Sequence, residues 1–577
     1  MVGEVPPHEF WLAPSKLVAV GTDPPLCAQC GVRSGLPLRV HRPLCLYIQE
    51  VLMTISSETS DAPVDAGDGG QGLAKGSISL AGILFVSIAT MAPGAGLAYA
   101  IMTGSLFSGG ALPLSVVGAT IGCVLVAVGI AQMAKHISTA GGLGSFVGRA
   151  FHPALGFVVA FCAPMFYLAA IPYLGLVFGN LVAASVFPDG GTGYKTTWII
   201  ATLGCLLVSG AFNYFGAAFS TKAGVILGTV EILVLLGLSV HMIISAGDAN
   251  SLSVFTTEHA NAEGFVGMSG VIAGSVYGFL AFIGFEAGAP LAAETKDPKR
   301  NVPRAIVWSA VIVGVFYVFG SYAASTYFGA DKLFDFMNFN AGDGWIGIAK
   351  NLWGAGWIVL LIALLNSSIA CANGASMGGT RHIWAMAHAG AIPKIFAATH
   401  HRYRSPVGAI YVMFGVGSVA AILGGLYWGP VASLGLFGTL IAVIALPVHM
   451  LAALACPVYY WRYRRSEFKV VVHLIIPTLG VLFLIPGFFV GAGITVFSFV
   501  APLSWPINLA APISLGVYLV AFGVMAYLVV KKPEALTALS DHGHTGEDAI
   551  AVEDLVPARA HTHSIGSVRG EVAVEAG

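Results

Sequence analysis

The sequence predicts an all-α membrane protein with about twelve spanning helices, and three observations support this fold class. Of the 577 residues, 56% are hydrophobic and only 10% are charged, whereas a typical soluble domain carries roughly 25% charged residues. Apolar segments of about 20 residues, the length that crosses a bilayer, recur along most of the chain. The first and the sixth of these segments are interrupted near their middle. We therefore expect a multi-pass protein of the lipid bilayer.

The two ends of the chain lack the apolar pattern. Residues 1–76 are polar or irregular and are expected to form a disordered tail, of which residues 1–52 are interpreted as an extension upstream of a start at Met53. Residues 533–577 are acidic with scattered histidines and are expected to form a second disordered tail. Cys27 and Cys30 form a CxxC spacing with His41 and Cys45 nearby, but a second CxxC pair is missing, so no metal and no cofactor is predicted.

Residues 77–532, between the two tails, are expected to form one transmembrane domain. Its third apolar segment is long enough to tilt in the bilayer, although its length alone does not fix the angle. The approximate bounds of the twelve expected spans are 78–103, 111–133, 153–187, 196–214, 220–245, 268–292, 305–328, 351–377, 407–427, 432–459, 470–492 and 509–530.

Lysine and arginine residues indicate the orientation of the spans. With a cytoplasmic N-terminus, all lysines and arginines from Lys75 to Lys532 lie on the cytoplasmic side except Lys195, Lys332 and Lys350. Cytoplasmic loops of membrane proteins are enriched in positive charge. We therefore expect both termini to be cytoplasmic and the protein to reside in a plasma or inner membrane. The net charge of -1 shows no basic excess, which argues against a nucleic-acid partner.

The two interruptions are the main indication of a functional site. The first span reads MAPGAG at residues 91–96, and the sixth reads FIGFE at residues 282–286. Proline and glycine both weaken a helix. Spans one to five and six to ten each begin with a broken helix, and halves with an odd number of spans have opposite orientations. This inverted-repeat pattern is typical of secondary transporters that bind their solute at the breaks, although a single break often only kinks a helix.

The breaks also indicate what kind of solute fits. The N-terminus of a half-helix presents N–H groups and a positive dipole end, which suit a carboxylate. Unwound carbonyl groups suit an ammonium group, so an amino acid matches two broken helices better than a sugar does. The candidate solute-binding residues are Ala92, Pro93, Gly94, Ala95, Gly96, Phe282, Ile283, Gly284 and Phe285.

Two buried acids are candidates for coupling or gating, because a carboxylate inside a spanning helix is costly and commonly functional. Glu231 in the fifth span either carries a proton or bonds to helix ends and serines. Glu286 at the sixth-span break is either a gate or proton-sensitive acid, or a cap for loosened N–H groups.

Three further polar residues join the acids as coupling or gating candidates. Ser367 and Ser368 in the eighth span either complete a sodium site with first-span carbonyl groups or bond to helix backbone. Arg381 follows that span and either pairs with the charged stretch 294–304 as an inner gate or only sets topology.

Two blocks of sequence resemble one family. Residues 284–306, GFEAGAPLAAETKDPKRNVPRAI, resemble the sixth-helix signature of the amino acid–polyamine–organocation (APC) superfamily of permeases. Residues 375–393, ASMGGTRHIWAMAHAGAIP, look like that family's eighth-helix end and following loop. The resemblance covers roughly residues 77–532 and implies the LeuT-type fold, a 5+5 inverted repeat with broken helices 1 and 6.

The resemblance also has two departures that bear on the solute and on coupling. Many relatives have a Gly-Ser-Gly-type break in the first helix, where this chain has Ala-Pro-Gly-Ala-Gly at residues 92–96. Many proton-coupled relatives have a lysine in the region where this chain places Glu231, with its own Lys222 more than two turns away.

The predicted function is secondary active transport of an amino acid or related amine by alternating access, either proton-coupled or by exchange. A polyamine permease, a sodium-coupled symporter and a non-transporting membrane sensor stay open as alternatives. An enzyme is not predicted, because no cluster of His, Asp and Glu lies at one membrane face outside the tails. A nucleotide-driven pump is disfavoured because the phosphate-binding loop motif is absent. The sequence leaves the substrate, the coupling ion and the oligomeric state open.

Overall fold

The structure is a computed structural model that describes residues 73–187, 190–262, 264–497, 500 and 502–541. The predicted extension 1–52, the start at Met53 and residues 542–577 of the second predicted tail lie outside the described residues. Within the described residues the only strands are β1 (Asn261–Ala262) and β2 (Phe265–Val266), which pair antiparallel. Everything else that is regular is helical, so the predicted all-α class is confirmed.

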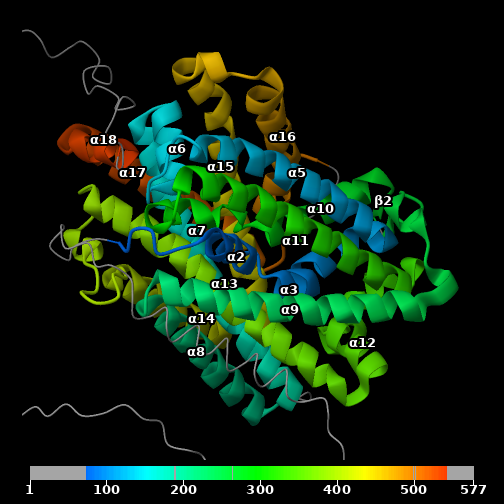
Figure 1. Ribbon diagram of the computed structural model, residues 1–577. Helices are drawn as coiled ribbons and strands as arrows, with labels where there is room; N and C mark the ends of the chain where they lie inside the picture. The colour runs from blue at the N-terminus through cyan, green and yellow to red at the C-terminus, as the bar shows by residue number, and fades with distance from the viewer. Residues whose placement is uncertain (1–72, 188–189, 263, 498–499, 501, 542–577) are drawn as a thin grey trace, which may run out of the picture. The chain divides into compact units, whose positions relative to one another are not determined.

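The described residues contain twelve helices that are long and apolar enough to cross a membrane, as predicted (Figure 1). In chain order they are built from α2 (Leu80–Thr90), α3 (Pro93–Ala95) and η1 (Gly96–Ile101); α4 (Ser105–Ser108), η2 (Gly109–Ala111) and α5 (Leu112–Ala134); α7 (Pro153–Val186); α8 (Thr192–Tyr214); α9 (Ala217–Ala246) and η3 (Gly247–Ala249); α10 (Met268–Phe282) and η5 (Phe285–Glu294); α11 (Pro298–Phe328); α12 (Gly344–Trp353), η7 (Gly354–Gly356) and α13 (Trp357–His388); α14 (Val407–Tyr427); α15 (Pro430–Tyr463); η10 (Val470–Ile475) and α16 (Ile476–Ala492); and η11 (Ile507–Leu509) and α17 (Ala510–Lys531).

Shorter helices lie between or after the spans. They are α6 (Gly142–Ala150), η4 (Leu252–Phe255), η6 (Ala330–Gly342), η8 (Lys394–Ala397), η9 (Arg465–Glu467) and α18 (Pro533–Asp541). The eighth span differs most from its expected bounds of 351–377, because α13 continues without a break to His388. Arg381 therefore belongs to a helix and not to the loop that follows it.

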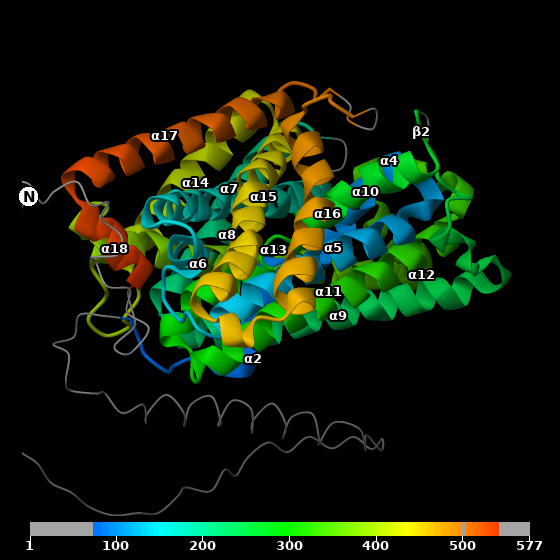
Figure 2. The ribbon, with the colours of Figure 1, turned by 90° about the horizontal axis from the view of Figure 1, so that it is seen from above.

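The first span lies among other helices, with α9, α11 and α13 packed against α2 and α3 (Figure 1). By contrast α17 lies at an edge of the bundle beside α18, as Figure 2 shows. Few α17 residues are buried, as expected of a helix that faces lipid along most of its length. The interior position of α2 and α3 puts the first break inside the protein, where Met91 and Ala92 are buried.

The first break falls at Met91 and Ala92, at the start of the predicted interruption. Ala92 has φ +47° and ψ +65°, the left-handed region that a residue other than glycine rarely adopts. Pro93 follows directly, and proline disfavours the right-handed helical conformation of the residue before it. The chain then resumes as the single turn α3 and the wider π-helix η1. The proline, more than the glycines after it, explains where the helix breaks.

The second break lies between α10 and η5. Ile283 is extended, and Gly284 has φ +125°, which favours glycine. A Cβ on Gly284 would lie 2.7–2.9 Å from atoms of Thr90, the last residue of α2. The two breaks therefore touch, and each half of the first ten spans begins with a broken helix, as the predicted inverted repeat requires.

Both ends of the described chain pack on the bundle. Ile78 forms a parallel bridge with Thr295, in which Ile78 N–H donates to the Glu294 carbonyl at 3.0 Å. In α18, Leu536 and Leu539 are buried and Arg149 of α6 donates to the Ser540 carbonyl at 3.2 Å. Residues 533–541, which the sequence assigns to a disordered tail, thus form the packed helix α18.

We predict that Gly284→Ala destabilises the protein by about 3 kcal/mol, because it adds backbone strain and a clash with Thr90. The measurement is thermal or denaturant unfolding of the purified protein in detergent. Gly267→Ala is the matched control: Gly267 also has positive φ, but a Cβ there meets no atom within 4 Å. The control should lose only about 1–2 kcal/mol from strain. Equal losses in the two variants would contradict close packing of the breaks.

Candidate functional site

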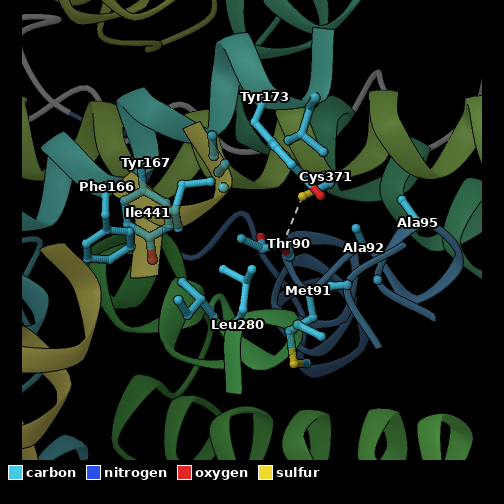
Figure 3. Close-up of a pocket in the computed structure, with 18 residues that line it drawn as sticks. Thr90, Met91, Ala92, Ala95, Phe166, Tyr167, Tyr173, Leu280, Cys371 and Ile441 are labelled. Atoms are coloured by element: carbon cyan, nitrogen blue, oxygen red, sulfur yellow. Dashed lines mark hydrogen bonds between the residues drawn. The ribbon is translucent and has the colours of Figure 1, made fainter. Parts of the chain in front are cut away.

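A cavity lies between the two breaks (Figure 3). The first break contributes Met91 and Ala92 to its wall, and the sixth span contributes Leu280 and Ile283. The other walls come from α7, α13 and α15. Of the predicted solute-binding residues, Ala92, Ala95, Gly96 and Ile283 line the cavity, whereas Pro93, Gly94, Phe282, Gly284 and Phe285 do not.

The aromatic wall of the cavity comes from α7, whose aromatic residues could cover a substrate but are interpreted as packing from the sequence alone. Phe166, Tyr167 and Tyr173 line the cavity, and Figure 3 shows all three reaching it from one helix. Phe166 and Tyr173 are seven residues apart, two helical turns, which places them on one face. That spacing, next to Pro164 and Pro172 in the same helix, is the sequence signal that could have identified this wall.

The backbone carbonyl groups at the first break have side-chain partners from other spans. The Cys371 thiol of α13 donates to the Thr90 carbonyl at 3.0 Å, the dashed line in Figure 3. The Tyr317 hydroxyl of α11 lies 2.8 Å from the Met91 carbonyl oxygen and 3.2 Å from that of Ala281. A single hydroxyl therefore serves carbonyl groups at both breaks. Neither residue was predicted.

The N–H groups just after the first break are also occupied. Gly94 N–H donates to Glu231 Oε1 at 3.4 Å, and Ala95 N–H donates to Ser367 Oγ at 3.0 Å. The other Glu231 oxygen accepts from Asn366 Nδ2 at 3.4 Å. Glu231 is fully buried in α9 and lies between α3 and α13. The expectation that these N–H groups are free for a solute carboxylate is wrong in this conformation, because the protein's own side chains bind them.

The two serines of α13 therefore differ in their surroundings. Ser367 contacts the first break through Ala95, whereas the Ser368 hydroxyl donates to the Leu364 carbonyl of its own helix at 3.4 Å. Both side chains are fully buried. Of the two serines, Ser367 is thus the one that contacts the broken helix.

At the second break, Glu286 has three polar neighbours. Its Oε2 accepts from Gly284 N–H at 3.0 Å, and its Oε1 accepts from the Tyr167 hydroxyl at 2.9 Å. His449 Nε2 of α15 lies 2.9 Å from Glu286 Oε2. The carboxylate thus caps a loosened N–H group and also contacts two other spans. His449 was not predicted, although a lone histidine in an apolar span is itself a signal.

Arg381 and Glu294 form a buried ion pair. Arg381 Nε and Nη2 donate to the two Glu294 oxygens at 2.8 and 3.3 Å, and both side chains are at most 1% exposed. This two-point contact joins α13 to the end of η5, and such pairs are the strong ones among charged contacts. The charged residues that follow Glu294 are exposed: Lys296, Asp297, Lys299, Arg300 and Arg304.

Comparison with known proteins gives one family and several distant relatives. The family model described as amino acid permease matches residues 82–535. The branched-chain amino acid permease BcaP of Bacillus subtilis is 24% identical over 369 residues, which cover 60% of this chain and 74% of that protein. The low-affinity putrescine importer PlaP of Escherichia coli is 24% identical over 319 residues, covering 54% and 67%. The L-methionine/branched-chain amino acid exporter YjeH of Escherichia coli is 29% identical over 197 residues, covering 33% and 43%.

We predict that Tyr317→Phe and Gly96→Ala act on the same contact. The first removes the hydroxyl between the breaks, and the second places a Cβ against that hydroxyl. Each should cost about 1–2 kcal/mol in unfolding experiments, because a buried carbonyl group loses its donor. The double variant should lose clearly less than the sum. Tyr277→Phe, whose ring stacks on Phe107, is the control and should change little. Additive losses would contradict the shared contact.

Proposed function

This chain belongs to the amino acid permease family, and from that premise we propose that it carries a neutral amino acid across the cell membrane by alternating access. The observation that supports this best is the cavity between two broken helices, at the centre of a bundle of twelve apolar spans. Secondary transporters of this architecture bind solutes at such breaks. Positive charge in alternate loops supports an orientation with both described ends in the cytoplasm.

The chemistry of the cavity supports a neutral amino acid over a diamine. Among the described residues that line it, none is acidic, and its walls include Leu174, Leu280 and Ile441. A second ammonium group in such a wall would be buried without a carboxylate partner, which is costly. An aliphatic side chain instead gains by leaving water. The relatives include transporters named for branched-chain amino acids and one named for putrescine, so the cavity favours the first kind.

We also propose that Glu231 carries a proton that is coupled to transport. Its carboxyl group contacts the N–H of Gly94 at the first break and the amide of Asn366. Gain or loss of a proton by Glu231 therefore changes the strength of its hydrogen bond to Gly94 in the broken first span. The sodium alternative is less well supported, because Ser368 bonds to its own helix and Ser367 already accepts from Ala95 N–H.

We predict that purified protein in proteoliposomes exchanges leucine, isoleucine or valine, and exchanges putrescine at least about tenfold more slowly, a difference of about 1.4 kcal/mol. Ile441→Trp, which fills the cavity, should abolish this exchange. Ile475→Trp, on an exposed part of the bundle, is the matched control and should retain it. Binding without exchange would support a sensor instead. Preferred exchange of putrescine would overturn the neutral amino acid proposal.

For coupling, we predict that Glu231→Gln abolishes accumulation driven by an imposed pH gradient. Exchange between equal pools should survive, because exchange does not require release of the proton. The glutamine keeps an oxygen that accepts from Gly94 N–H, so the fold is preserved. Ser368→Ala is the control and should still follow the pH gradient. Proton-driven accumulation that persists in Glu231→Gln would exclude this role, and uptake that follows a sodium gradient and weakens in Ser367→Ala would support a sodium symporter.

A further inference from the structure

The pair formed by Glu286 and His449 has a proton count that its geometry determines. His449 Nδ1 lies 2.7 Å from the Ala445 carbonyl oxygen of its own helix. A carbonyl oxygen only accepts, so Nδ1 carries a hydrogen. His449 Nε2 lies 2.9 Å from Glu286 Oε2. Two lone pairs at that distance repel, so the close approach is stable when one proton is bound, either to the imidazole nitrogen or to the carboxyl group.

We propose that Glu286 and His449 share a single proton, and that this proton holds the broken sixth span against α15. With the proton present, the pair is neutral overall, whichever atom carries it. Without it, a carboxylate faces the lone pair of an imidazole nitrogen, and the pair separates. With a second proton, an imidazolium faces a neutral carboxylic acid, and the attraction between opposite charges is lost. His449 is thus a positioning residue for the second break.

Because the pair is buried among aromatic rings, gain or loss of this proton has a large effect on the packing around it. Glu286 and His449 are each about 1% exposed, and the rings of Phe166 and Phe285 lie with centroids 5.9 and 5.3 Å from the imidazole. Water does not screen a charge change in such a place, so its effect on packing is large. Gly284 N–H and the Tyr167 hydroxyl add hydrogen bonds to the carboxylate.

Other titratable groups face the pair from the elements packed around it. Within the described part of the chain they are Tyr167 on α7, Cys123 on α5 and His382 on α13, whose ring centroid lies 6.4 Å from that of Tyr167. Tyr167 and Cys123 lose protons only at alkaline pH in their ordinary range. His382 lies beside Tyr167, so its removal serves as a check on the assignment.

Tyr167 connects the pair to the cavity. Its side chain lines the cavity wall, and its hydroxyl donates to Glu286. A solute that displaces Tyr167 would remove one donor from the carboxylate and alter its hold on the shared proton. This consequence for transport rests on the proposed function, whereas the shared proton itself does not. The pair can therefore be tested without a substrate.

The test is the pH profile of thermal unfolding for the full-length protein in detergent, between about pH 5.5 and about pH 8.5, where histidine chemistry normally falls. The wild-type midpoint should fall by about 3 °C or more towards alkaline pH as the shared proton is lost. In His449→Gln the profile should flatten, because the amide donates to Glu286 without a titratable proton. Glu286→Gln should flatten it too, which keeps the proposal testable if one variant fails to fold. His382→Gln and His473→Gln should retain the wild-type slope; the second removes a histidine that stacks on Tyr460.

Each outcome has a definite meaning. A flat wild-type profile, or a wild-type slope in both His449→Gln and Glu286→Gln, overturns the shared proton. A slope lost only in His382→Gln assigns the effect to that residue and overturns the proposal. The expected profiles together with no solute exchange would leave the pair intact and remove the proposed function. Solute exchange together with a flat wild-type profile, or with a wild-type slope in both variants, would support the proposed function and overturn the shared proton.

Discussion

The structure depends on one constraint, which is that a backbone polar group freed inside a membrane must find its partner within the protein. Two broken spans free several such groups, and water is not available to them. Most partners come from other spans: Tyr317 and Cys371 for the carbonyl groups, Glu231 and Ser367 for the N–H groups of the first break. The Gly284 N–H at the second break is bound by Glu286 of the same span. These polar side chains, otherwise costly in apolar helices, are thereby explained.

The same constraint explains why the breaks lie together. Each break alone would need its own set of partners, but Tyr317 serves carbonyl groups from both. Thr90 packs directly on Gly284, and the strained backbone at Ala92, two residues after Thr90, is buried. Strain of this kind persists only where the surroundings fix it. The two breaks are therefore in direct contact and depend on the same neighbouring side chain.

The sequence was sufficient for the spans and for both breaks, because apolar length and the Pro93 and Gly284 interruptions are local properties. It did not predict which side chains bind the backbone groups that the breaks set free. Tyr317 and His449 come from the seventh and tenth spans, and periodicity does not say which faces of two helices meet. The helix α18 was missed because it is short and lies in an acidic stretch whose composition resembles disorder. Site residues that depend on tertiary contact were thus the ones left out.

The two buried acids differ in how firmly they are held, and this difference suggests a division of roles. Glu286 has three contacts at 2.9–3.0 Å, which fix both carboxyl oxygens. Glu231 contacts Gly94 and Asn366 at 3.4 Å and is also hydrogen-bonded to the Ser367 side chain. Glu231 therefore joins α9 to the first break and to α13, whereas Glu286 joins the second break to α7 and α15.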